Sequence, residues 1–167
     1  MTSDGGGHVI LGIGTEDRGD DAAGLIAARR LLGTGLPATV QILALCGDGV
    51  TLMNAWKGAE TLTIIDAIEA GVPPGTIVRI DPWKHPIPAR AFVSSHLLGL
   101  AEAIQISMSF GEFPRTATMY GIQGRCFGMH AGVSDVVMSA VEEVVKRILA
   151  EIESNAYPAA EKPGRRL

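Results

Sequence analysis

The chain has 167 residues, of which 47% are hydrophobic and 19% charged, with a formal net charge of −4 at pH 7. This composition excludes a disordered chain, and the length suits one complete hydrophobic core. The absence of a Lys/Arg cluster inside the predicted domain argues against nucleic acid as a partner, and no apolar run reaches the roughly 18 residues of a membrane span. We expect a cytoplasmic protein without a membrane partner, whose Cys46 and Cys126 are reduced thiols.

The first half of the chain alternates short apolar runs with segments of helical periodicity. Residues 8–13, 39–45 and 61–65 are predicted strands, and residues 21–32 and 50–57 are predicted helices. Gly33 stands where a left-handed helix C-terminus favours a residue without a Cβ. This order of elements predicts parallel strands joined by helices.

The second half adds two strands and two helices. Only about ten residues separate Asp66 from the strand-like run 76–80, whereas a parallel crossover usually takes about a dozen or more, so this strand is predicted to run antiparallel. We predict a helix capped by Ser94 or Ser95 and running to about Ser109, a strand at 115–121, and a helix capped by Ser134 and running to about Glu153.

These elements predict an α/β fold: a single domain with a twisted five-stranded, mostly parallel sheet, one antiparallel strand, and helices on both faces. The domain is expected to cover residues 8–154. A flexible N-terminus, 1–7, and a mobile C-terminal tail, 155–167, are expected to flank it.

The loop after the first strand, Gly12-Ile13-Gly14-Thr15-Glu16-Asp17-Arg18-Gly19-Asp20-Asp21, carries the first candidate chemistry. A dinucleotide-binding loop would need a third glycine where Asp17 stands, and its helix N-terminus would not face carboxylates. Helix capping is a structural explanation for Asp20 or Asp21, but it accounts for only one of the two acids. The other acid is a candidate ligand.

Asp66 and His96 are the other candidates, because sites in open parallel sheets form beyond the carboxyl ends of the strands. Asp66 emerges from a buried apolar strand, although it could also be a turn former. His96 is predicted in the first turn of a Ser-capped helix, where the helix dipole favours a neutral imidazole. Two carboxylates and one imidazole suit a divalent transition metal with open positions. The remaining histidines, His8, His85 and His130, are assigned structural or surface roles.

Five segments, in this order, resemble the hydrogenase maturation endopeptidases over residues 8–150. They are Gly12-Ile13-Gly14, Gly19-Asp20-Asp21-Ala22-Ala23-Gly24, Ile64-Ile65-Asp66-Ala67 with Pro74-Gly75-Thr76, Ser95-His96 with Leu100-Ala101-Glu102-Ala103, and Gly121-Ile122-Gln123. The resemblance implies that Asp21, Asp66 and His96 are both the nickel ligands and the catalytic residues. It also implies removal of a C-terminal extension from the nickel-loaded precursor of a nickel-iron hydrogenase large subunit. The nickel would then arrive with this protein partner, and no organic cofactor is expected.

The sequence departs from the family pattern at two positions. Thr15 stands where an asparagine is common, so an amide contact is lost or replaced by a hydroxyl. Cys46 stands, in an ungapped match, where a further acid is common, with Asp48 two residues on, so that fourth position is left unassigned. A non-catalytic nickel-recognising assembly chaperone and a nucleotide-binding Rossmann-like domain are the alternative functions. The general base is left open between Asp21 and Asp66.

Overall fold

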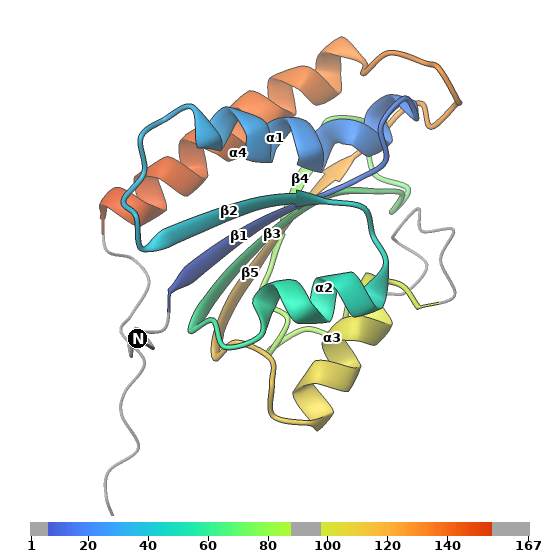
Figure 1. The fold of residues 1–167 in the computed structure, drawn as a ribbon. Helices are drawn as coiled ribbons and strands as arrows, with labels where there is room; N and C mark the ends of the chain where they lie inside the picture. The colour runs from blue at the N-terminus through green and yellow to red at the C-terminus, as the bar shows by residue number, and fades with distance from the viewer. Residues whose placement is uncertain (1–6, 88–97, 155–167) are drawn as a thin grey trace, which may run out of the picture.

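The computed structural model describes residues 7–87 and 98–154 (Figure 1). The strands are β1 (His8–Ile13), β2 (Val40–Leu45), β3 (Thr61–Ile68), β4 (Ile77–Ile80) and β5 (Thr116–Gln123). The helices are the 3₁₀ turn η1 (Gly19–Ala22), α1 (Ala23–Leu32), α2 (Gly49–Trp56), α3 (Leu100–Ser109) and α4 (Asp135–Glu153). The predicted order of elements in the chain is confirmed for these described residues.

The five strands form one sheet in the order β2-β1-β3-β5-β4. β1 pairs in parallel with β2 and β3, and β3 pairs in parallel with β5. β4 runs antiparallel to β5, with Val78 opposite Gly121. The prediction of one antiparallel strand is therefore confirmed, because the short connection from β3 to β4 leaves no room for a crossover helix.

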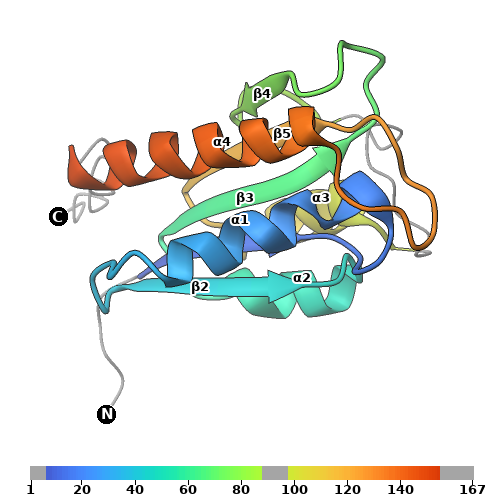
Figure 2. The ribbon, with the colours of Figure 1, turned by 90° about the horizontal axis from the view of Figure 1, so that it is seen from above.

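Helices cover both faces of the sheet, as Figures 1 and 2 show: α1 and α4 lie side by side on one face, and α2 and α3 lie on the other. Successive side chains of β3 point to opposite faces of the sheet: Ile64 belongs to the core under α2 and α3, and Ile65 belongs to the core under α1 and α4. This double coverage explains why the central strands are mostly apolar on both faces rather than alternating with polar residues.

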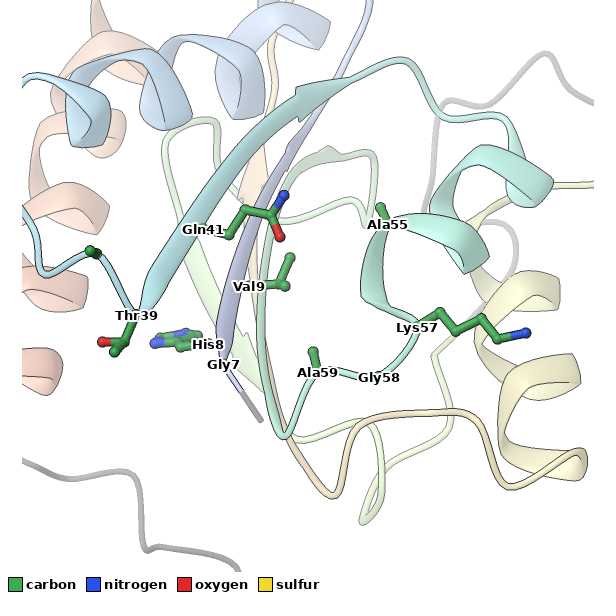
Figure 3. Close-up of a pocket in the computed structure, with 10 residues that line it drawn as sticks. Gly7, His8, Val9, Thr39, Gln41, Ala55, Lys57, Gly58 and Ala59 are labelled. Atoms are coloured by element: carbon green, nitrogen blue, oxygen red, sulfur yellow. The ribbon is translucent and has the colours of Figure 1, made fainter. Parts of the chain in front are cut away.

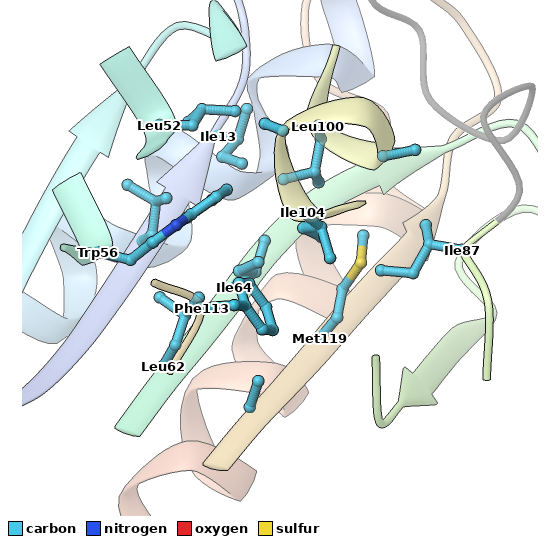
Figure 4. Packing of buried hydrophobic residues seen from close by; sticks show 14 of the residues in the cluster. Ile13, Leu52, Trp56, Leu62, Ile64, Ile87, Leu100, Ile104, Phe113 and Met119 are labelled. Carbon is cyan, nitrogen blue, oxygen red and sulfur yellow. The ribbon is translucent and has the colours of Figure 1, made fainter. Parts of the chain in front are cut away.

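The core under α2 and α3 contains aromatic side chains among the aliphatic ones (Figure 4). The rings of Trp56 and Phe113 meet edge to face, with centroids 5.5 Å apart. The Trp56 indole is completely buried and donates a hydrogen bond of 3.0 Å to the Ser107 hydroxyl, so its polar atom is satisfied. These contacts join α2 to α3 and hold both helices against the sheet.

Close packing of α1 on the sheet depends on Gly24. A Cβ at this position would lie 2.2 Å from the carbonyl oxygen of Ile13 and 2.3 Å from that of Ile65. The start of α1 therefore lies directly on Ile13 at the end of β1 and on Ile65 within β3, which brings the loop between β1 and α1 next to β3.

Several predicted boundaries were wrong. α3 begins at Leu100, with Gly99 in the N-cap position, rather than at Ser94 or Ser95, which lie outside the described residues. Gly33 has a right-handed conformation (φ −80°), and its amide donates to the carbonyl of Arg30, so the helix ends in a tightened last turn rather than in a left-handed cap. β3 continues past Asp66 to Ile68 because β5 keeps pairing with it.

Ser134 occupies the N-cap position of α4, as predicted, but its side chain makes no cap hydrogen bond to the helix. The predicted termini, 1–7 and 155–167, lie outside the described residues except for Gly7. Among the residues that are described, no helix is long and apolar enough to cross a membrane.

Candidate functional site

The candidate site lies at the carboxyl ends of β1 and β3, where the chain leaves the two strands in opposite directions along the sheet. After β1 it passes through η1 and α1 to β2, and after β3 it turns towards β4 on the far side of β5. Such a divergence opens a crevice between neighbouring strands, where ligands bind in open α/β sheets. Both predicted acids that fall within the described residues lie at this point, beyond the end of β1, which we call the crevice between β1 and β3.

Asp21 is carried by η1, which contacts β3. Asp21 is only 4% exposed to solvent. Burial raises the pKa of the Asp21 carboxyl, and this effect exceeds the opposing ones: hydrogen bonds from the Thr15 hydroxyl and amide, and the positive charge of Arg18. The carboxyl is thus held in place by Thr15 and is more basic than an ordinary aspartate.

Asp66 lies within β3, one residue beyond Ile65, the last β3 residue that pairs with β1. Asp66 therefore has no β1 residue paired beside it, and the η1 turn contacts β3. Burial raises the pKa of Asp66 well above its ordinary value, and the negative charge of Asp21 raises it further, against a hydrogen bond from the amide of Ala67. Two buried carboxyls therefore interact here.

His96 lies outside the described residues, so its placement relative to the two acids stays a prediction. The described helix α3 begins at Leu100, four positions after His96. Within residues 7–87 and 98–154, no group of three or more His, Cys, Asp or Glu side chains is arranged to hold a metal ion.

The other histidines that were assigned structural or surface roles lie away from the two acids or on the surface. The His8 ring is hydrogen-bonded through Nε2 to the Thr63 hydroxyl at 2.8 Å, and burial lowers the pKa of His8 to about 4 despite the negative charge of Glu151. His85 and His130 are exposed.

A cavity of about 540 Å³ lies at the opposite end of the sheet from the two acids (Figure 3). His8, Thr39 and Gln41 line it at the start of β1 and β2, and residues 57–59 line it after α2. The predicted residues Asp21 and Asp66 are not part of it. We therefore assign the candidate chemistry to the crevice between β1 and β3.

The sequence profile of the hydrogenase maturation protease family, HycI, matches residues 28–151. The chain belongs to the hydrogenase maturation protease family. It is a peptidase, an endopeptidase that processes the precursor of a hydrogenase large subunit. Family membership does not favour the two alternatives, a non-catalytic chaperone and a nucleotide-binding domain.

Named relatives agree with this assignment. The Hydrogenase 2 maturation protease of Escherichia coli K12 is 28% identical over 153 residues, which cover 90% of this chain and 93% of that one. The structure of the hydrogenase maturating endopeptidase HybD from E. coli superposes with a TM-score of 0.80 at 27% identity, covering 89% of this chain and 93% of its own. The [NiFe] hydrogenase maturation protease HycI of Thermococcus kodakarensis gives a TM-score of 0.68 at 27% identity, with coverages of 92% and 96%.

Thr15, one of the two departures from the family pattern, and Asp48, two residues after the other, have definite roles in the structure. Thr15 supplies a hydroxyl to Asp21 in place of the common asparagine amide. Asp48 caps α2 by accepting a hydrogen bond of 3.2 Å from the amide of Thr51. Cys46 and Cys126 are exposed in the structure.

The capping interpretation of Asp20 was wrong. Its carboxylate makes no cap hydrogen bond to η1 or α1, and instead accepts four hydrogen bonds from residues more than a hundred positions later in the chain. No local spacing could have revealed these contacts. The only sequence signal was that capping could explain at most one of two adjacent acids.

Proposed function

We propose that Asp21, Asp66 and His96 form the site with which the enzyme recognises nickel in the hydrogenase precursor and removes its C-terminal extension. Nickel is here part of the substrate, carried in by the precursor, and not a resident cofactor. The precursor of a nickel-iron hydrogenase large subunit is the protein partner.

The observation that carries the proposal is that Asp21 and Asp66 are both buried at the crevice between β1 and β3, where η1, which carries Asp21, contacts β3, which carries Asp66. Their mutual repulsion raises the free energy of the ionised pair in the free enzyme. A divalent cation held between the two carboxylates would relieve both this repulsion and the cost of burial. The pair is thus suited to meet a metal ion that another protein presents.

Two carboxylates and one imidazole leave open positions on a metal ion. An open set of ligands is what recognition of substrate-bound nickel requires, because a metal enclosed by four ligands from this chain could not keep its ligands from the precursor. The nickel could polarise the adjacent scissile carbonyl or a water molecule.

Asp21 and Asp66 are also the candidates for the general base. A base works best when its pKa is close to the working pH, and the pKa of each carboxyl is raised above the ordinary aspartate value. A histidine whose nitrogen binds the metal cannot accept the proton through that same nitrogen, which favours the two carboxyls for this role.

The test is in vitro trimming of purified, nickel-loaded precursor, with the product weighed by mass spectrometry. Asp66→Asn is expected to abolish trimming and to leave folding intact, because the amide keeps the shape of the side chain but neither bears a charge nor accepts a proton. Asp17→Asn is the matched control: it removes an exposed acid from the same loop and is expected to trim normally. Normal trimming by Asp66→Asn would overturn the proposal, as would equal trimming of nickel-loaded and nickel-free precursor.

A further inference from the structure

The carboxylate of Asp20 joins two loops that are distant in the sequence. Asp20 is completely buried. One of its oxygens, Oδ1, accepts a hydrogen bond of 2.7 Å from the amide of Ser134. The other, Oδ2, accepts from the amides of Arg125 and Cys126 at 2.7 and 3.0 Å, and from the Ser134 hydroxyl at 3.0 Å.

Backbone hydrogen bonds surround this carboxylate and join the same two loops. The amide of Asp20 donates to the carbonyl of Cys126 at 2.8 Å, and the amide of Gly19 donates to that of Ala131 at 3.1 Å. A third bond of 2.5 Å runs from the amide of His130 to the carbonyl of Asp17. The segment 124–134, between β5 and α4, is therefore bound to the loop before α1 at Asp17, Gly19 and Asp20.

The segment 124–134 is itself anchored to the body of the protein. Phe127 packs against the core under α1 and α4, and its ring lies over Gly124, where a Cβ would be 2.3 Å from it. Ser134 stands directly before the first turn of α4. Asp20 is thus bonded to a support that the long helix α4 and the core hold in place.

Asp21, the next residue in η1, is held from the other side by the end of β1. A Cβ on Gly14 would lie 2.1 Å from the carbonyl oxygen of Asp21, so the two backbones are in direct contact. The η1 turn is consequently fixed between β1 and the segment 124–134. The carboxylate of Asp20 accepts four of the hydrogen bonds that join the turn to this segment.

We infer that Asp20 is a positioning residue, which locks the β5–α4 segment onto the η1 turn and thereby sets the direction in which Asp21 meets Asp66 and the substrate. This inference rests on the proposed function, because it gives Asp21 its role. The partners of the Asp20 carboxylate are Arg125, Cys126 and Ser134, and Asp20 acts on the site through Asp21.

Asp20→Asn tests the inference with the smallest change of shape. An amide offers one oxygen and one NH₂ group, so at least one of the backbone N–H groups that now face a carboxylate oxygen would face another donor. Because a displacement of about 1 Å at a catalytic group costs roughly 100-fold in rate, we expect kcat for precursor trimming, per folded enzyme, to fall about 10- to 100-fold. KM is expected to change less than threefold, on the order of the effect of losing one weak contact.

The matched control is Asp135→Asn, which removes the same charge from an exposed side chain in the first turn of α4, next to Ser134. It is expected to keep kcat unchanged. The folded fraction of each variant is measured by circular dichroism under the assay conditions, so that a loss of folded protein is not counted as a loss of rate. A merely structural role for Asp20 would lower the folded fraction and leave kcat per folded molecule at the wild-type value, which would overturn the inference.

Gly19→Ala provides a second variant that keeps the Asp20 carboxylate. Gly19 has φ +59°, and its added Cβ would lie 2.4 Å from the carbonyl oxygen of Cys126, so it pushes the same two loops apart. Gly111→Ala is its control, since Gly111 has a similar φ of +69° and open space around it. We expect Gly19→Ala to lower kcat and Gly111→Ala to leave it unchanged; equal kcat values would overturn the inference.

Asp66→Asn, assayed alongside, separates failure of the inference from failure of the proposed function. Loss of trimming in Asp66→Asn together with wild-type kcat in Asp20→Asn would overturn only the role of Asp20. Normal trimming in Asp66→Asn would overturn the proposed site itself.

Discussion

The charge of Asp21 raises the pKa of Asp66 across the crevice between β1 and β3. The two residues are 45 positions apart in the sequence. They come together because β3 continues past the end of β1, and the η1 turn packs against β3 at that point. Their interaction has consequences for stability as well as for catalysis.

Asp66→Asn is expected to stabilise the metal-free enzyme at pH 7 by about 1 to 3 kcal/mol, because it removes the cost of a buried, repelled carboxylate. The pKa of Asp66 is higher in the folded than in the unfolded state, so its contribution to stability is complete below the unfolded pKa and is lost as the pH rises towards the folded pKa. The gain should therefore appear above about pH 4 and grow with pH. Urea unfolding of both proteins between pH 4 and 8 measures it.

The neighbouring Asp20 provides the opposite case. Burial alone would raise the pKa of Asp20, but its four hydrogen bonds together lower it. Asp20→Asn is therefore expected to destabilise the enzyme at pH 7 by about 1 to 3 kcal/mol. If Asp66→Asn and Asp20→Asn shifted stability in the same direction, the assigned environments of the two carboxyls would be wrong.

The lowered pKa of His8 predicts that the folded protein loses stability in mild acid. Burial lowers the pKa of His8 to about 4 from 6.5, despite the negative charge of Glu151, so the unfolded chain binds a proton between these pH values and the folded chain does not. A histidine whose pKa is depressed on folding contributes stability above its unfolded pKa, and this is lost as the pH falls. The free energy of unfolding should fall by about 3 kcal/mol from this residue between pH 7 and pH 4.

Denaturant unfolding of His8→Gln over the same pH range checks this expectation. Glutamine is neutral throughout and can still hydrogen-bond to Thr63. Its stability should depend less on pH than that of the wild type; parallel pH profiles would contradict the assignment.

Thr15 is expected to matter through its hydroxyl. Thr15→Ala removes a donor to the Asp21 carboxylate, which lets the pKa of Asp21 rise further and frees the side chain to turn. We expect kcat for trimming to fall about tenfold, as for the loss of one hydrogen bond to a charged group, and Thr15→Ser to retain the wild-type rate. Single-turnover trimming assays of the two variants measure the difference, and equal rates for Ala and Ser would exclude a role for the hydroxyl.

Gly24→Ala is expected to destabilise the enzyme by more than about 3 kcal/mol, because the added Cβ would overlap backbone oxygens of both β1 and β3, which cannot move independently of the sheet. Gly33→Ala, at the other end of α1, has a right-handed backbone and no contact closer than 3.4 Å. It should be neutral or stabilise by about 0.4 to 1 kcal/mol. Thermal unfolding of the two variants provides the comparison.

Periodicity and chain length determined much of the fold before any tertiary information. The apolar runs located all five strands to within about three residues at each end, a normal error for sequence-based boundaries. The short link from Asp66 to β4 determined the direction of that strand, because too few residues were present for a crossover. That Asp21 and Asp66 come near each other could be predicted, because parallel strands end at the same edge of a sheet.

Tertiary contacts decided the rest. Capping rules assign partners within one turn of a helix, whereas the four donors to the Asp20 carboxylate lie more than a hundred residues away in the sequence. The Ser134 hydroxyl donates to Asp20 and makes no cap hydrogen bond to α4. Asp66 ended a predicted strand, yet β5 pairs with β3 as far as Ile68, so the strand continues. The sequence alone was enough to predict candidate site residues, because residue type and place relative to the strands are local properties. Only the folded chain decided how they are held, since burial and hydrogen bonding depend on which distant segments pack together.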